Sequence, residues 1–230
     1  MRFYALLLSF LLFHAPSAMA QEIYLSTLSN QLFRLNLTDC SYQQVGAIPF
    51  STTDISFHPN GNLYAVNSSG RLYQIDVLNG TSSLIHAFES NASQTYTALT
   101  CSATGIFYAC GLGGDLWAYN LATNTGQFLG NTGYGAEGDL AFYEGALYMA
   151  AQNDDIVRVD IQNPSNSTVI IDENVNGRIF GIVTYAANCE SLTVYSLTES
   201  PSAIYEVNFA NNSLDFYQHS ASNEWWCQPV

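Results

Sequence analysis

Residues 54–81 decide the fold, and they read DISFHPNGNLYAVNSSGRLYQIDVLNGT. Runs of apolar, aromatic and β-branched residues alternate here with turn signals, the pattern of consecutive β-strands. The turn at 58–61 combines a proline that fixes φ with a glycine that tolerates positive φ. The pair Asn79 and Gly80 is a strong hairpin signal, because a type I′ turn needs positive φ at both central residues. With the apolar run at 83–88, the stretch predicts a four-stranded antiparallel meander.

The same unit recurs along the chain. The aromatic of its second strand falls at Tyr24, Tyr64, Tyr108, Tyr148 and Tyr195, spaced by 40, 44, 40 and 47 residues. A third-strand position falls at Phe33, Tyr73, Trp117, Val157 and Tyr205, spaced by 40, 44, 40 and 48 residues. Two markers that keep one period in the forties, with four strands per unit, are typical of propeller blades. The sequence therefore predicts an all-β fold, a five-bladed β-propeller of four-stranded antiparallel blades.

The first unit lacks its leading strand, and the C-terminal tail supplies a match for it. The tail segment EWWC at 224–227 aligns with the leading segments at 54–57, 98–101 and 139–142. An open arc of blades would leave sheet edges exposed as templates for aggregation. We therefore expect the C-terminal strand to close the ring by completing the first blade.

Residues 1–20 read as a cleaved secretory signal. Arg2 is followed by an apolar core at 3–13 and by an A-x-A cleavage pattern at 18–20. The apolar core is too short to span a bilayer. We expect residues 21–230 to form a single propeller domain that is secreted, either extracellular or periplasmic.

The charge of the chain is strongly acidic. It carries 19 acidic residues against 5 basic ones, a formal net charge of −14. Such a surface repels phosphate backbones and anionic lipid, so we expect neither nucleic acid nor a membrane as partner. We expect a soluble monomer.

Five cysteines follow the signal, and export permits disulfides between them. They are Cys40, Cys101, Cys110, Cys189 and Cys227. Cys101 and Cys110 are out of register within one hairpin, which disfavours a bond between them. We expect Cys227 to latch the tail to Cys189 or to Cys40, with Cys189 preferred. The alternative is that all five are buried free thiols.

The blade unit resembles that of NHL-like and SMP-30-like propeller proteins, whose blades often read D-[IL]-A-F-x-P-x-G-x-L-Y. Residues 54–64 match this signature, and residues 139–148 match it with a turn one residue shorter. The resemblance implies the propeller architecture. Members of that group include lactonases, lyases, sugar binders and scaffolds, so the resemblance does not choose among functions. The metal ligands of the SMP-30-like lactonases have no counterparts that can be placed in this chain.

Three leading strands begin with an acid, namely Asp54, Asp139 and Glu224. Leading strands line the channel of a propeller, so these carboxylates could converge on a ligand or on a Ca²⁺ ion. They could also form the acid and base of a glycoside hydrolase or lactonase. The structural alternative is that each Asp accepts hydrogen bonds from backbone N–H groups of its own turn.

The longest loops connect one unit to the next, at 87–97, 130–138 and 172–180. They carry Tyr96, Tyr134, Glu137, Arg178 and Phe180. Aromatic faces beside polar groups suit a glycan or a peptide, although aromatics also pack between blades. We therefore expect a non-enzymatic module that presents a loop face to a protein or glycan partner, with no catalytic residue and no required cofactor. The alternative is a hydrolase that uses the channel acids.

Overall fold

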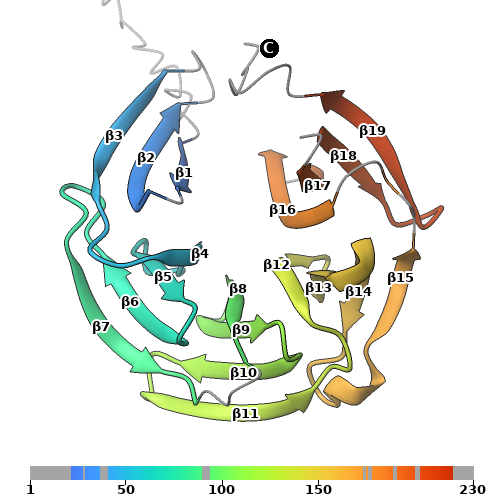
Figure 1. The fold of residues 1–230 in the computed structure, drawn as a ribbon, viewed down its shortest axis with the longest axis horizontal. Helices are drawn as coiled ribbons and strands as arrows, with labels where there is room; N and C mark the ends of the chain where they lie inside the picture. The colour runs from blue at the N-terminus through green and yellow to red at the C-terminus, as the bar shows by residue number, and fades with distance from the viewer. Residues whose placement is uncertain are drawn as a thin grey trace, which may run out of the picture.

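The structure is a computed structural model that describes residues 22–27, 29–36, 41–89, 94–172, 175, 178–188, 191–199 and 203–219. Its strands form five antiparallel sheets, arranged as blades around a central axis (Figure 1). The predicted all-β, five-bladed propeller is confirmed.

The blades follow one another in chain order. Blade 1 contains β1 (Glu22–Ser26), β2 (Gln31–Asn36) and β3 (Tyr42–Ala47). Blade 2 contains β4 (Thr52–Phe57), β5 (Leu63–Asn67), β6 (Arg71–Ile75) and β7 (Ser82–Ala87). Blade 3 contains β8 (Tyr96–Cys101), β9 (Ile106–Gly111), β10 (Asp115–Asn120) and β11 (Thr125–Asn131). Blade 4 contains β12 (Ala136–Tyr143), β13 (Ala146–Ala151), β14 (Asp155–Val159) and β15 (Thr168–Asp172), with the short helices η1 (Gln152–Asp154) and η2 (Pro164–Asn166). Blade 5 contains β16 (Arg178–Asn188), β17 (Ser191–Glu199), β18 (Ala203–Asn208) and β19 (Ser213–His219).

In blades 2 to 5 the first strand lies nearest the axis and the fourth lies at the rim (Figure 1). Blade 1 has three strands among the described residues, and β1 occupies the position of a second strand. Among the described residues the first unit thus has no leading strand, in agreement with the sequence pattern. The expected closing strand at 224–227 and the expected signal at 1–20 lie outside the described residues, so both stay predictions.

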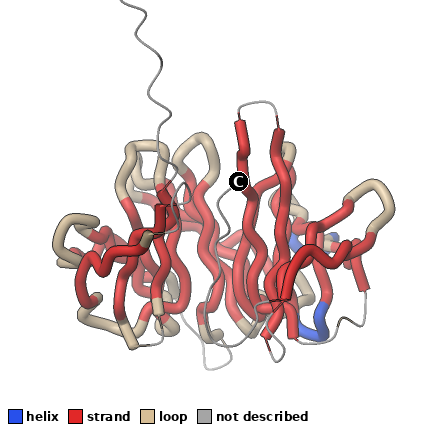
Figure 2. Tube along the Cα trace, turned by 90° about the horizontal axis from the view of Figure 1, so that it is seen from above, coloured by secondary structure: helices blue, strands red, loops and turns tan. Residues whose placement is uncertain are grey.

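The ring has two unlike faces. The inner strands begin on the face that carries the connections between blades, which we call the loop face. They end on the opposite face, which carries the turn after each inner strand and which we call the hairpin face. The β16–β17 hairpin is the longest of the fold, with strands of 11 and 9 residues, and it rises above the other turns of the hairpin face (Figure 2).

In blades 2, 3 and 5 the pairing of the inner strand shifts just before the repeat position that Asp54 occupies in blade 2, and in blade 4 the shift spans that position. The register shifts between Thr52 and Asp54 in β4, and between Tyr96 and Ala98 in β8. Because a bulge interrupts the alternation of side chains, the sequence pattern hides the first residues of these strands. This corrects the predicted loops at 87–97, 130–138 and 172–180, since β8, β12 and β16 begin inside them.

The core lies between blades, and the second-strand tyrosines cross it. Four of them contact an aromatic ring of the next blade, with ring centroids 4.6–5.6 Å apart. The pairs are Tyr24 with Phe57, Tyr64 with Phe107, Tyr108 with Phe142, and Tyr148 with Phe209. The period read from the sequence is thus the period of inter-blade packing.

Cys101 and Cys110 are free thiols, as their register predicts. Burial raises the pKa of each thiol to about 12, so both stay protonated at neutral pH. Cys40, Cys189 and Cys227 lie outside the described residues, and the latch between them stays a prediction.

Substitution of Phe107 tests how much of the free energy of unfolding depends on packing between blades. Its ring is fully buried between Tyr64 and His58. Replacing Phe107 with alanine removes a large ring from a filled core, and we expect a loss of about 3–5 kcal/mol in the free energy of unfolding. The matched control is Phe128→Ala on β11, where the ring is 48% exposed and where we expect a loss of about 1 kcal/mol or less. Urea unfolding measures both; equal losses would contradict this account.

Candidate functional site

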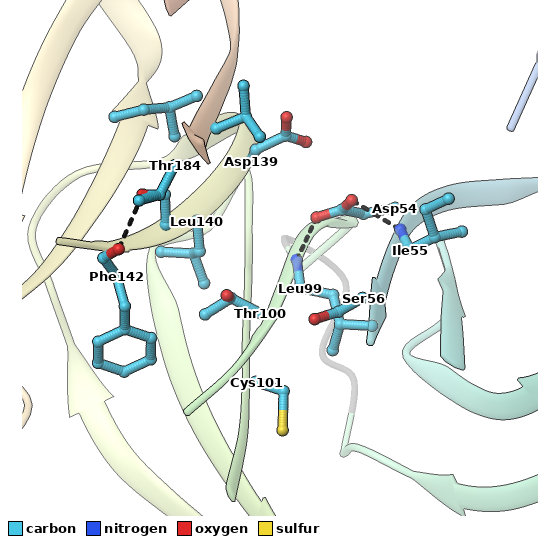
Figure 3. Close-up of a pocket in the computed structure, with 13 residues that line it drawn as sticks. Asp54, Ile55, Ser56, Leu99, Thr100, Cys101, Asp139, Leu140, Phe142 and Thr184 are labelled. Carbon is cyan, nitrogen blue, oxygen red and sulfur yellow. Dashed lines mark hydrogen bonds between the residues drawn. The ribbon is translucent and has the colours of Figure 1, made fainter. Parts of the chain in front are cut away.

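A cavity of about 300 Å³ lies on the axis of the ring, among the inner strands β4, β8, β12 and β16. Asp54 and Asp139 lie near each other at one end of it, and Phe142 and the Cys101 thiol lie toward the other (Figure 3). The sequence thus predicted correctly that both aspartates face the channel. Glu224 lies outside the described residues.

Asp54 joins blade 2 to blade 3. Its Oδ2 accepts a hydrogen bond from the backbone N–H of Leu99 on β8 at 2.5 Å (Figure 3). Its Oδ1 accepts from the backbone N–H of Ile55 at 2.6 Å. Both carboxyl oxygens are therefore engaged with backbone, one of them on the neighbouring blade.

Asp139 holds the matching position between blades 4 and 5: its carboxyl lies against Gly181 on β16, and the nearby backbone N–H of Ile182 counteracts the rise of its pKa. One repeat position of the inner strand is occupied in blades 2 to 5 by Asp54, Ala98, Asp139 and Gly181. The residue that follows this position is Leu99 in blade 3 and Ile182 in blade 5. At this position the Asp54 carboxyl binds the backbone of the next blade, and the Asp139 carboxyl lies against it. The alternative that each Asp accepts N–H groups of its own turn applies in part to Asp54, since one of its donors is the adjacent Ile55 and the other lies on the next blade.

The two carboxyls share a poorly solvated space. Both aspartates are half-buried, and the inner strands surround their carboxyl groups closely enough to disfavour the charged form. Burial raises the pKa of Asp139 to about 7. Burial, and then the nearby Asp139, raise the pKa of Asp54 well above its usual value, against the opposing effect of the two N–H donors.

The channel offers no evident metal centre in the part of the chain that the structure describes. Within it, no group of three or more His, Cys, Asp or Glu side chains comes close enough to hold a metal ion. Two desolvated acids that already accept backbone hydrogen bonds are poor starting ligands for Ca²⁺, which wants several oxygens. The expected third acid, Glu224, is outside the described residues, so the Ca²⁺ expectation stays untested.

Tyr96 does not belong to a binding surface. It is fully buried, its hydroxyl donates to the carbonyl of Glu89 at 2.6 Å, and its ring stacks on Phe88 with centroids 5.6 Å apart. Its ring edge also lies against Gly70, where a β-carbon would collide with it. The expectation that Tyr96 contacts a ligand is corrected, because the ring packs between blades 2 and 3.

The other four predicted residues gather at the loop face of blades 4 and 5. Arg178, at the start of β16, forms ion pairs with Glu137 on β12 and with Glu199 on β17. The Arg178 side chain is 55% exposed. Tyr134 lies in the loop before β12 and is half-buried against the core between blades 3 and 4. Phe180 is half-buried on β16, where its carbonyl approaches Gly138 so closely that a side chain there would clash.

Two residues beside this group were not predicted from the sequence. Leu112, in the turn after β9, is 38% exposed, and Gln152 is an exposed residue of η1. Gly135 lies between them, since a β-carbon on it would meet the Leu112 carbonyl and the Gln152 side chain. We call Leu112, Tyr134, Gln152 and Arg178 the loop-face patch. Neither Leu112 nor Gln152 stands out in the sequence, because each lies in a short turn without a motif.

Comparison with known proteins supports the fold. No protein-family model matches the chain, and no curated protein matches it by sequence. Among solved structures, it is similar to a chain in the crystal structure of a nidogen/laminin complex, with a TM-score of 0.65 and 11% sequence identity. The similarity covers 85% of this chain and 74% of that one. At this identity the likeness shows the β-propeller fold alone, and the NHL-like and SMP-30-like resemblance stays at the level of architecture.

Within the residues that the structure describes, no helix has the length and apolarity to cross a membrane.

The channel acids predict an unusual dependence of stability on pH. Because Asp139 has a pKa of about 7 when folded and a usual value of 3.8, the folded protein binds this proton more tightly than the unfolded chain does. Its contribution to stability is complete below about pH 4 and is lost as the pH rises through 7. We expect Tm to be roughly 3–8 °C higher at pH 5 than at pH 8, which corresponds to about 2 kcal/mol in a domain of this size.

The variant Asp139→Asn should reduce this pH dependence, because it replaces the ionisable carboxyl with a neutral amide of similar size, while the raised pKa of Asp54 leaves a smaller residual slope. The matched control is Glu206→Gln, which removes one exposed charge on β18 and should leave the slope unchanged. Melting curves between pH 4 and pH 9 measure both. A wild-type Tm that rises from pH 5 to pH 8 would refute the raised pKa.

Proposed function

We propose that the protein is an exported, non-catalytic interaction module whose loop face binds a protein or a glycan. The observation that carries this proposal is the state of the channel acids. Both oxygens of Asp54 accept backbone N–H groups, one of them from the next blade, and the Asp139 carboxyl lies against Gly181 of the next blade. These side chains hold the ring together, which leaves the loop-face patch as the better candidate surface.

The alternative is a hydrolase that uses the same two carboxyls. An inverting glycosidase needs an acid and a base about 6.5–9.5 Å apart, with room for a water molecule and a sugar between them. A carboxyl with a raised pKa near neutrality suits a general acid, and Asp139 has that property. Its base would have to be Asp54, whose pKa is also raised and whose two oxygens are engaged. Neither oxygen of Asp54 is therefore free of a backbone donor, which makes it a poor base for activating water.

The loop-face patch has the composition of a recognition surface. It combines an exposed leucine, a half-buried tyrosine, an exposed amide and an arginine oriented by two glutamates. Tyrosine and arginine are enriched where proteins bind partners, and the strands beneath hold these side chains in place. The similar propeller chain comes from a nidogen/laminin complex, which supports a protein partner over other classes.

The proposal is tested by a search for a partner followed by a binding measurement. Residues 21–230 serve as bait in a pull-down from extracellular fluid and as probe on a glycan array. For the partner found, the double variant Leu112→Ser with Arg178→Gln should weaken binding at least about tenfold, or roughly 1.4 kcal/mol. The matched control is Leu78→Ser in the β6–β7 turn on the hairpin face, where the leucine is 85% exposed. Equal loss of affinity in both variants, with unchanged Tm, would contradict the loop face as the binding surface.

The hydrolase alternative has its own test. We expect the wild-type protein to show no turnover on a panel of aryl glycosides and lactones between pH 4 and pH 8. Turnover by the wild type that Asp139→Asn abolishes, while its Tm is retained, would replace the interaction module with an enzyme.

A further inference from the structure

Three aspartates gather on the loop face of blade 4. Asp154 ends the short helix η1, and Asp155 begins β14 directly after it. Asp172 ends β15 and is the pairing partner of Asp155 in the sheet. Directly paired residues of adjacent strands project from the same side of the sheet, with Cβ atoms about 4.5–5.5 Å apart. We call Asp154, Asp155 and Asp172 the acidic corner.

Asp155 is the buried member of the acidic corner. It is 9% exposed, and among the described residues none donates a hydrogen bond to its carboxyl. Burial raises the pKa of this carboxyl, and the nearby Asp172 and Asp154 raise it further. A carboxylate held away from water without a donor or a countercharge destabilises the fold. A cation brought to the acidic corner would offset both effects.

No arginine in the described part of the chain pairs with the acidic corner. The chain has five basic residues, and all of them are arginines. Arg178 begins β16 nearby, but its guanidinium is paired with two glutamates. Arg158 lies about 10 Å farther along β14, toward the hairpin face. Arg34 and Arg71 belong to blades 1 and 2, and Arg2 lies outside the described residues.

The acidic corner adjoins the loop-face patch. Asp154 Oδ1 accepts a hydrogen bond at 3.0 Å from the backbone N–H of Ile179, the residue that follows Arg178. Gln152 of the loop-face patch lies in the same short helix as Asp154. A protein that covers the loop-face patch would therefore also reach the acidic corner.

The acidic corner suits an organic cation better than a metal ion. Among the described residues, no group of three or more His, Cys, Asp or Glu side chains comes close enough to hold a metal ion. A guanidinium carries five N–H donors in a planar fork that matches carboxylate oxygens in pairs. It can therefore bridge carboxyls that do not converge on one point. The ammonium of a lysine is a compact point charge and bridges such carboxyls less well.

We propose that the acidic corner binds the guanidinium group of an arginine on a protein partner of the loop face. The Asp155 and Asp172 carboxylates accept its N–H groups, and Asp154 adds a third negative charge. The guanidinium supplies the countercharge that the described arginines of this chain do not provide. This inference rests on the proposed function, because it names the chemistry that a partner of the loop face would carry.

Short peptides test this chemistry before any partner is known. The probe is fluorescein-labelled hexa-arginine, and its matched control is hexa-citrulline, in which a neutral ureido group replaces each guanidinium. We expect the wild-type protein to bind hexa-citrulline at least about tenfold more weakly than hexa-arginine, measured by fluorescence anisotropy. Equal affinity for hexa-lysine and hexa-arginine would contradict recognition of a guanidinium.

Two double variants of equal net charge locate the site. Asp155→Asn with Asp172→Asn should weaken hexa-arginine binding at least about tenfold. The matched control is Glu144→Gln with Glu206→Gln, which neutralises two exposed acids away from the acidic corner and should weaken binding by about twofold or less. A general attraction between a cationic peptide and an acidic protein would weaken equally in both, and that result would overturn the proposal.

Stability separates a binding role of Asp155 from a structural one. Because folding raises the pKa of Asp155, its contribution to stability is complete at low pH and is lost as the pH rises through the folded pKa. At pH 7.5 its charge therefore disfavours the folded state, and Asp155→Asn should raise Tm while it weakens hexa-arginine binding. A lower Tm for this variant would assign Asp155 to the support of the fold instead. Asp172→Asn changes an exposed residue, so it repeats the binding test in a protein whose fold does not depend on that side chain.

The remaining outcomes distinguish this inference from the proposed function. A partner that binds through the loop-face patch and is insensitive to Asp155→Asn with Asp172→Asn would refute the arginine site alone. Hexa-arginine that binds the acidic corner while the partner binds elsewhere would refute the proposed function alone. Ca²⁺ that raises the Tm of the wild type, but not of this double variant, would replace the arginine site with a metal site.

Discussion

No blade of this propeller can bury its apolar surface alone, and that constraint governs the rest of the structure. A four-stranded sheet presents two faces, and the core clusters of this protein mix residues from adjacent blades. Each inter-blade contact therefore stabilises two sheets at once. Because each blade packs against its neighbours, a weak interface destabilises the blades on both sides of it. The repeats keep a similar spacing because each must place the same inter-blade contacts.

The packing of blades around an axis also determines the surroundings of the polar groups in the channel. Inner strands converge on the axis, where backbone N–H groups of one blade face the side chains of another. An aspartate there satisfies a donor that would otherwise be buried without a partner, a state that costs about 1–3 kcal/mol. The same crowding strips water from the carboxyl and favours its protonated form. Asp54 and Asp139 thus balance a gain in hydrogen bonding against a loss of solvation, and the balance moves with pH.

The sequence was informative where one physical rule acted repeatedly. Tyrosines at one repeat position predicted the blades, because the same inter-blade contact recurs at each of them. The pattern could also place Asp54 and Asp139 on the channel, since inner strands face the axis. It could not show that Asp54 reaches Leu99, a contact 45 residues away along the chain. It misplaced Tyr96 on a loop, because a bulge in β8 breaks the alternation that marks a strand. It missed Leu112 and Gln152, which become neighbours only when blades 3 and 4 are packed together.

The long β16–β17 hairpin gives the two faces of the ring different shapes. From the repeat position of Asp139 and Gly181, β16 continues three residues farther than β12, or roughly 10 Å at the rise of a strand. A ridge of that height stands beside the mouth of the channel on the hairpin face (Figure 2). A broad, flat protein approaching from that side would rest on the ridge and tilt, touching only part of the rim. The described residues of the opposite face form no ridge of that height, so the described part of the ring presents partners with different shapes from its two sides.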